Sequence, residues 1–186
     1  MVEAYLEQIQ EQMSTLTAIS RSSLSFYKGQ TFPQKIGVTH IAKSAIKLHH
    51  GRLRGSAIHL DASHAGEAMS FGIASEILQV FSNLILNAAD ALTETQQPRI
   101  SIRTRRTVRW NHFIIADNGP GIPEHVQARL FQAHATGKDS GMGMGLWLSR
   151  HIITKHGGHI RFKTCREPAR CGTVLSVTLP IHASAD

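Results

Sequence analysis

Two glycine-rich clusters constrain this chain more than any other feature. Residues 117–123 read Asp-Asn-Gly-Pro-Gly-Ile-Pro, and residues 141–146 read Gly-Met-Gly-Met-Gly-Leu. Because glycine has no side chain, backbone amides in such clusters can approach phosphate oxygens, and an acid beside them can bind the edge of a base. The clusters therefore indicate a nucleotide pocket. Glycine pairs also mark ordinary turns, so this interpretation depends on the surrounding residues.

Helical and strand patterns alternate around the two clusters. Apolar residues at helical spacing predict helices over 39–51, 75–92 and 145–156. Alternation of apolar and polar residues predicts extended segments over 32–38, 57–60, 68–71, 100–106, 109–116, 159–165 and 172–179. Thr39 is the predicted N-cap of the first helix. The last strand pairs are joined by hairpins too short for parallel crossovers, so we predict an α/β fold whose mixed sheet carries its helices on one face.

A longer amphipathic helix is predicted over residues 4–28, where apolar residues recur every three or four positions. At about 1.5 Å per residue it would extend roughly 37 Å, which is more than a small domain needs for packing. We expect its apolar stripe to meet another helix or a second copy of the chain. Packing on its own domain is the alternative.

Composition narrows the function less than the motifs do. The net charge of +7 and the pI near 9.9 fit a nucleic-acid binder, but equally a protein that handles a triphosphate. Four arginines alternate along the predicted strands and fit a solvated sheet face: Arg103, Arg105, Arg106 and Arg109. Cys165 and Cys171 are expected to be free thiols, which favours a reducing cytosol. No apolar run reaches the roughly 18 residues of a membrane helix, and no signal peptide is predicted.

The helix over 75–92 carries one polar stripe on an otherwise apolar surface. Asn83, Asn87 and Asp90 follow one another at intervals of four and three residues and so share one face. Buried amides require hydrogen-bond partners. The two asparagines either cap neighbouring backbone groups, or they line a site and hold a metal ion through the amide oxygen.

Four segments in this order resemble the boxes of one family. Residues 83–92 resemble the N box of the sensor histidine kinase catalytic domain, 117–121 its first glycine box, 141–146 its second, and 172–174 its last. This family belongs to the GHKL ATPase superfamily, which also contains gyrase and MutL. The resemblance covers residues 32–180, and it assigns 32–186 to the catalytic ATP-binding domain, with a lid at about 124–140. Residues 1–31 resemble the second helix of the dimerisation hairpin.

The resemblance implies a Bergerat fold, a two-layer α/β sandwich that binds ATP beneath a mobile lid. It implies that Asp117 accepts the adenine amino group, that Gly121 lets the base approach closely, and that Asn87 coordinates Mg²⁺ between the phosphates. The amides of Gly143 and Gly145, which open a helix, would bind phosphate. The complete set of implied nucleotide-binding residues is Asn87, Asp90, Asp117, Gly119, Gly121, Ile122, Lys138, Gly141, Gly143, Gly145, Leu146 and Thr173.

The lid departs from the family pattern. Phe131, Thr136 and Lys138 match the usual lid segment, whereas residues 132–135 and Gly137 do not. Its packing is therefore the least transferable part of the resemblance. We expect a loose lid without nucleotide.

Asn83 favours phosphoryl transfer over hydrolysis. ATP hydrolases of this superfamily place a glutamate one helical turn before the magnesium asparagine, where it activates water. An amide at residue 83 cannot accept that proton, whereas an acceptor imidazole already carries a lone pair. We therefore predict Asn83 and Asn87 as catalytic residues of a kinase. The alternatives are an anti-sigma-type serine kinase, a nucleotide-binding regulatory module, and a basic nucleic-acid binder.

The phosphoacceptor is predicted to lie outside this chain. None of the 12 histidines is followed by the acid that marks the acceptor motif. The expected partners are ATP with Mg²⁺, the acceptor histidine of a dimerisation domain, and a response regulator, in a homodimeric full-length protein, with no nucleic acid. Five histidines are predicted to be surface or sheet-edge residues rather than metal ligands: His49, His50, His151, His156 and His159.

Overall fold

The computed structural model describes residues 32–53, 57–61, 69–133, 144–166 and 171–181. The predicted helix over 4–28 lies outside these residues. The described elements, in chain order, are β1 (Gln34–Gly37), α2 (Val38–Leu48), β2 (Ala57–Asp61), β3 (Met69–Gly72), α3 (Ala74–Ala91), β4 (Arg99–Arg106), β5 (Trp110–Asp117), α4 (Glu124–Gln127), α5 (Gly145–Lys155), β6 (His159–Cys165) and β7 (Gly172–Pro180).

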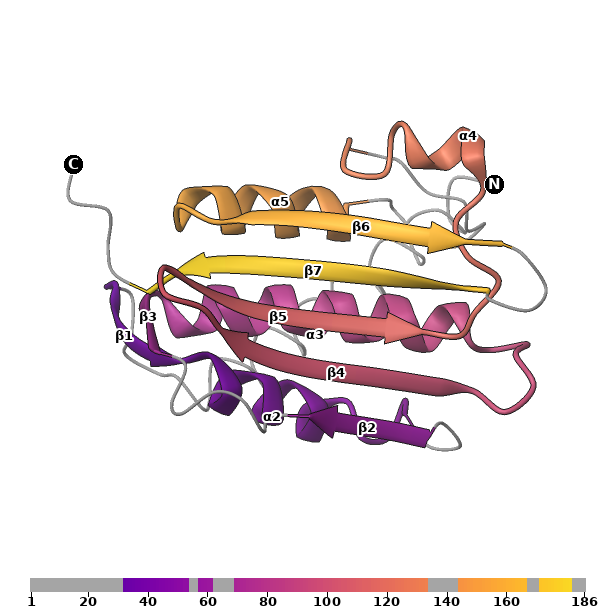
Figure 1. Cartoon of the computed structure of the whole chain (residues 1–186), viewed down its shortest axis with the longest axis horizontal. Helices are drawn as coiled ribbons and strands as arrows, with labels where there is room; N and C mark the ends of the chain where they lie inside the picture. Colours follow the sequence, from indigo (N-terminus) through magenta and orange to yellow (C-terminus); the bar gives the residue numbers. More distant parts are fainter. Residues whose placement is uncertain (1–31, 54–56, 62–68, 134–143, 167–170, 182–186) are drawn as a thin grey trace, which may run out of the picture.

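Five strands form the main sheet in the order β2-β4-β5-β7-β6 (Figure 1). Strand β2 runs parallel to β4, and the other three pairings are antiparallel. The predicted mixed sheet is therefore confirmed. β1 and β3 pair in a separate two-stranded sheet, which the sequence pattern did not predict as a unit. The Asn111 amide of β5 ties this small sheet to the main one by donating to Met69 O at 2.8 Å and Ser70 Oγ at 2.9 Å.

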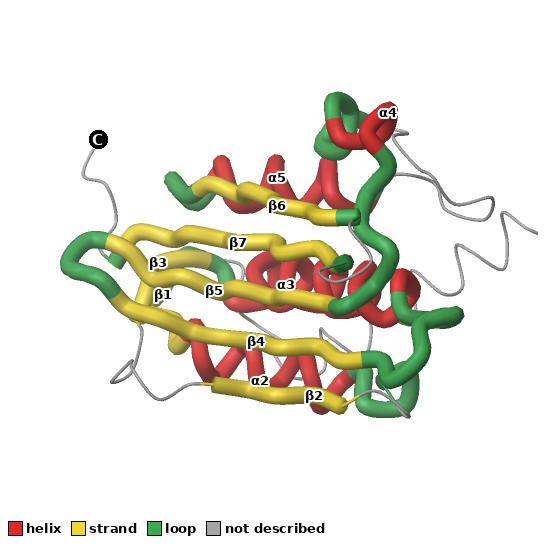
Figure 2. The backbone as a smooth tube through the Cα atoms, turned by 45° about the vertical axis from the view of Figure 1, so that its right-hand side comes forward, coloured by secondary structure: helices red, strands yellow, loops and turns green. Residues whose placement is uncertain are grey.

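Helices α2, α3 and α5 lie on the same side of the five-stranded sheet, as the two views in Figures 1 and 2 show. The alternation in β4 explains this arrangement, because Ile100 and Ile102 are buried while Arg103 and Arg105 are exposed. Phe81 of α3 stacks on Phe113 of β5, with ring centroids 3.9 Å apart and ring planes 11° from parallel. The core therefore lies between the helices and one face of the sheet.

The structure tests the predicted N-cap at Thr39 and the predicted state of the two cysteines. Thr39 is not an N-cap, because α2 begins at Val38 after Gly37 and has no side-chain cap. The Thr39 hydroxyl instead lies 3.0 Å from the buried Thr104 hydroxyl of β4, so a tertiary contact outweighs the local capping preference. Neither Cys165 nor Cys171 forms a disulfide, in agreement with the prediction. Among the described helices, none combines the length and apolar character needed to cross a bilayer.

The stacked phenylalanine pair is expected to be a main contributor to stability. Phe113→Ala should lower the free energy of unfolding by about 3–5 kcal/mol, because it removes a fully buried ring and leaves a cavity against Phe81. Phe113→Leu should cost less than about 1.5 kcal/mol. Urea denaturation measures both, with Val108→Ala as the control, since Val108 is 93% exposed. Equal stability of the alanine and leucine variants would contradict this account of the core.

Candidate functional site

Asp117 lies at the end of β5, where the first glycine cluster meets β7. Its Oδ1 accepts hydrogen bonds from the backbone N–H of Gly119 at 2.9 Å and of Thr173 at 3.2 Å. Both bonds end on one oxygen, and Oδ2 accepts no hydrogen bond from the described residues. The carboxylate is thus fixed in orientation and keeps one oxygen as an available acceptor.

Burial raises the pKa of Asp117 above its ordinary value, and the amide hydrogen bonds from Gly119 and Thr173 oppose that shift in part. The net direction is upward, so the folded state disfavours the charged form. The charge therefore destabilises the fold slightly at neutral pH, where the group is ionised in the unfolded chain. A half-buried carboxylate held at such a cost suits a group whose acceptor oxygen is used by a ligand.

Two glycines allow the backbone segments around Asp117 to pack closely. A Cβ at Gly172, whose φ is +146°, would collide with the carbonyl oxygen of Asp117. A Cβ at Gly121, whose φ is +73°, would collide with the carbonyl oxygen of Cys165 in β6. The close approach seen at Gly121 is therefore to the sheet, and its approach to a base stays a prediction.

Thr164 of β6 joins these segments, and the sequence analysis missed it. Its hydroxyl accepts a hydrogen bond from the N–H of Ile122 at 2.8 Å and donates one to the carbonyl of Gly172 at 3.0 Å. It also lies 3.4 Å from the hydroxyl of Thr173, its cross-strand neighbour. The predicted site residues Ile122 and Thr173 are therefore joined through one hydroxyl. The available signal was a threonine in the first strand of the closing hairpin, opposite Thr173.

The C-terminal end of α3 reaches the same place. Gly119 is buried against Ala91, and a Cβ at Gly119 would lie 3.0 Å from the Ala91 carbonyl oxygen. One residue earlier, the Asp90 carboxylate pairs with Arg52 Nη2 at 2.6 Å. Arg52 follows α2, and the sequence analysis did not single it out. The predicted role of Asp90 toward a nucleotide stays a prediction.

The middle of α3 faces the start of α5. The Asn83 amide nitrogen lies 3.4 Å from both the carbonyl oxygen of Gly145 and the buried hydroxyl of Ser149, and donates to both. Asn87, one turn further along α3, is half-buried. Leu146 packs against the hydrophobic core. The structure therefore brings Asn83 and Gly145 together, as the capping interpretation of Asn83 required, and leaves the metal interpretation of Asn87 untested.

Part of the predicted site lies outside the described residues, namely Lys138, Gly141 and Gly143 of the lid and the second glycine cluster. The start of the segment predicted as the lid forms the short helix α4. Its Gln127 side chain donates to the Ile122 carbonyl at 2.9 Å and so ties α4 to the first glycine cluster.

Two histidines differ from the prediction that they lie at the surface. His49 is 8% exposed, and the His156 side chain is 5% exposed. Each lies at the C-cap of its helix, and the His156 ring packs against Gly72 and accepts from Ile73 at the β3–α3 junction. Within the described ranges, no group of three His, Cys, Asp or Glu side chains could hold a metal ion.

The chain resembles known proteins in both sequence and fold. Residues 72–183 match the family described as histidine kinase-, DNA gyrase B- and HSP90-like ATPases. The C4-dicarboxylate transport sensor protein DctB of Rhizobium meliloti is 30% identical over 177 residues, which are 94% of this chain and 28% of DctB. The sensory histidine kinase/phosphatase NtrB of Vibrio alginolyticus is 36% identical over 118 residues, which are 58% of this chain and 33% of NtrB. This chain thus spans about a third or less of these relatives.

Solved structures share the fold. The catalytic domain of histidine kinase ThkA superposes with a TM-score of 0.71 at 24% identity and covers 82% of this chain and 99% of that domain. The mycobacterial sensor histidine kinase MprB gives a TM-score of 0.69 at 22% identity over 80% of this chain and 97% of its own. The predicted two-layer α/β fold is confirmed.

The Thr164 hydroxyl is expected to hold the Asp117 region together. Thr164→Val should lower the free energy of unfolding by about 1–3 kcal/mol, because the Ile122 N–H and the Gly172 carbonyl lose their partner. Thr164→Ser keeps the hydroxyl and should cost less than half as much. Chemical denaturation of the two variants measures the difference. A valine variant as stable as the serine variant would show that the hydroxyl does not hold these segments.

Proposed function

Because this chain belongs to the family of histidine kinase-, DNA gyrase B- and HSP90-like ATPases, we propose that it is the ATP-binding catalytic domain of a two-component sensor histidine kinase. In this proposal it donates the γ-phosphoryl group of Mg-ATP to a histidine outside the chain. The observation that carries the proposal is the Asp117 carboxylate, fixed between two backbone amides with one oxygen left to accept a hydrogen bond.

Asp117 would select adenine. An exocyclic amino group is a donor, so a carboxylate oxygen accepts from adenine but has no donor to offer the carbonyl oxygen of guanine. Thr173, whose side chain is buried next to Asp117, would back the base. Gly119, Gly121 and Ile122 shape this end of the pocket because they hold the turn that follows β5.

The phosphates would lie between α3 and the start of α5. The N-cap residue of α5, Met144, makes no side-chain capping bond, so the first amides of the helix are not capped by it. Free N–H groups at a helix start, together with the helix dipole, favour a bound anion. Gly145 and Leu146 contribute such amides, and Gly141, Gly143 and Lys138 complete the phosphate contacts in this proposal.

Asn87 would hold Mg²⁺ through its amide oxygen, a hard ligand that suits this ion. The residues present fit that role. Asn87 is half-buried on the face of α3 that also presents Asn83 toward the second glycine cluster. A magnesium ion shared with phosphate needs only one or two protein ligands, so no cage of protein side chains is required. The ion would supply charge neutralisation on the phosphates.

Asn83 favours transfer to histidine. Its amide nitrogen donates to the Gly145 carbonyl and the Ser149 hydroxyl, a contact that a glutamate could not make because it has no proton to donate at neutral pH. Without a carboxylate here, water lacks a general base, and an imidazole with its own lone pair is the better nucleophile.

The proposal also includes the segment before the catalytic domain and the partners of the full-length protein. The alignment with DctB extends over 94% of this chain, well beyond residues 72–183. In this proposal residues 1–31 are the second helix of a dimerisation hairpin, residues 32–186 are the catalytic domain, and the full-length protein is a homodimer. An acceptor histidine and a response regulator complete the proposed phosphorelay, which we place in the cytoplasm.

Asp117→Asn should separate ATP binding from folding. The asparagine oxygen can still accept from Gly119 and Thr173, but the amide donor then faces the adenine amino group, so ATP affinity should fall about a hundredfold or more. The melting temperature should stay the same or rise slightly, since a partly desolvated charge is removed. Calorimetric titration with ATP, beside a thermal melt, measures both effects. Unchanged ATP affinity would disprove the adenine assignment.

Phosphoryl transfer is the direct test of the kinase assignment. Mixing the chain with γ-labelled ATP, Mg²⁺ and a purified phosphoacceptor hairpin should label the hairpin and leave the chain itself unlabelled. Asn87→Ala should slow labelling by on the order of a hundredfold. Exposed Gln79→Ala, on the same helix as Asn87 and outside the proposed site, serves as the matched control. ATP binding without transfer would favour a regulatory module, and a serine phosphoprotein product would favour the serine-kinase alternative.

A further inference from the structure

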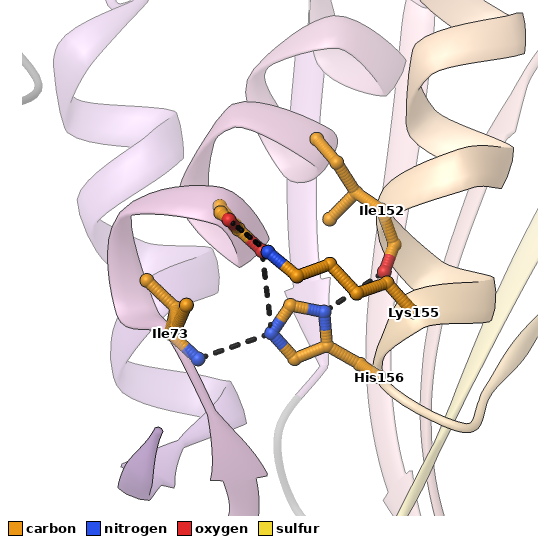
Figure 3. Close-up of polar contacts among 5 residues, drawn as sticks. Ile73, Ile152, Lys155 and His156 are labelled. Atoms are coloured by element: carbon orange, nitrogen blue, oxygen red, sulfur yellow. Dashed lines mark hydrogen bonds and ion pairs between the residues drawn. The ribbon is translucent and has the colours of Figure 1, made fainter. Parts of the chain in front are cut away.

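His156 joins two helices of the site that are far apart in the sequence. It lies at the C-cap of α5, and its ring reaches the start of α3 (Figure 3). The backbone N–H of Ile73, the N-cap residue of α3, donates to His156 Nε2 at 3.1 Å. On the other side of the ring, Nδ1 lies 2.8 Å from the carbonyl oxygen of Ile152.

These two bonds fix the tautomer. A backbone N–H can only donate, so Nε2 accepts, and a carbonyl oxygen can only accept, so Nδ1 carries the proton. Glu76 Oε2 lies 3.7 Å from Nε2, but Nε2 has no proton to offer it. The ring therefore bridges the helices as a neutral imidazole with both nitrogens used.

The bridge is built into the core. A Cβ at Gly72 would lie 2.5 Å from His156 Cδ2, so the ring fits against the β3–α3 junction only because residue 72 is glycine. The side chain is 5% exposed. A second link between the same helix ends, Lys155 Nζ to Glu76 Oε1 at 2.7 Å, is exposed, and surface ion pairs contribute little. His156 is therefore the firmer of these two links.

At the opposite end of α5 the contact with α3 is weaker. The Asn83 amide reaches Gly145 and Ser149 over 3.4 Å, near the limit for a hydrogen bond. Because α5 is a rigid rod of 11 residues, a firm hold at His156 limits where Gly145 can lie along α3. The adenine end of the pocket, around Asp117, is built on β5, β6 and β7 and does not depend on this hold.

We propose that His156 is a positioning residue for the phosphate end of the nucleotide pocket. It keeps α5 at a fixed position along α3, so that the amides of Gly145 and Leu146 act on the same phosphates as Asn87. The inference rests on the proposed function, since it assumes that the start of α5 binds phosphate.

Two substitutions separate the two hydrogen bonds. In His156→Asn the amide can replace Nδ1 toward Ile152 but is too short to reach Ile73. In His156→Gln the amide oxygen can take the place of Nε2 and accept from Ile73. Calorimetry with Mg-ATP and NMR titration with adenosine are the readouts. We expect ATP affinity to fall about five- to tenfold in the asparagine variant, to stay within about twofold of wild type in the glutamine variant, and adenosine affinity to be unchanged in both.

Two further variants distinguish the proposed positioning role of His156 from a simple folding defect. Gly72→Ala should displace the ring and reproduce the asparagine phenotype with His156 intact. Lys155→Met, which removes only the exposed ion pair, should bind ATP as wild type does. ATP affinity that is unaffected by His156→Asn, equal losses for ATP and adenosine, or a glutamine variant as impaired as the asparagine variant would each overturn the inference. Failure of the wild-type chain to bind ATP would refute the proposed function as well.

Discussion

Close backbone packing at the end of β5 is the constraint on which the site depends. Gly172 and Gly121 place the carbonyl oxygens of Asp117 and Cys165 where no side chain could fit. In this arrangement the N–H groups of Gly119 and Thr173 converge on one carboxylate oxygen. The carboxylate is held against a desolvation penalty by the fold around it, so its second oxygen is preoriented before any ligand arrives.

Helix α3 connects the surroundings of Asp117 to the core and to α5. Its apolar side fills the core, with Phe81 stacked on β5, and its polar stripe faces the candidate site. The end of α3 touches Gly119, its middle contacts α5 through Asn83, and its start is tied to α5 through His156. One helix thus relates the base end of the proposed pocket to the phosphate end.

Periodicity and motif order were sufficient to predict most of the fold. The helices α3 and α5, the strands β4 to β7 and the mixed sheet lie where the sequence placed them, because amphipathic period and hairpin length are local properties. The prediction for Thr39 was wrong because its hydroxyl meets Thr104, 65 residues away, and no local pattern carries that information. The pairing of β1 with β3 also escaped prediction, since both strands are short and far apart.

The sequence by itself determined the family, the residue types of the pocket, and the presence of an amide rather than a carboxylate at position 83. These properties follow from which residues the chain contains and from their order. Only the tertiary structure decided how the residues are held. Thr164 reaches Ile122 across 42 residues and His156 reaches Ile73 across 83, and each looked like an ordinary strand or surface residue in the sequence. The physical reason is that a hydroxyl or imidazole becomes a tie only when folding buries it beside backbone groups that need a partner.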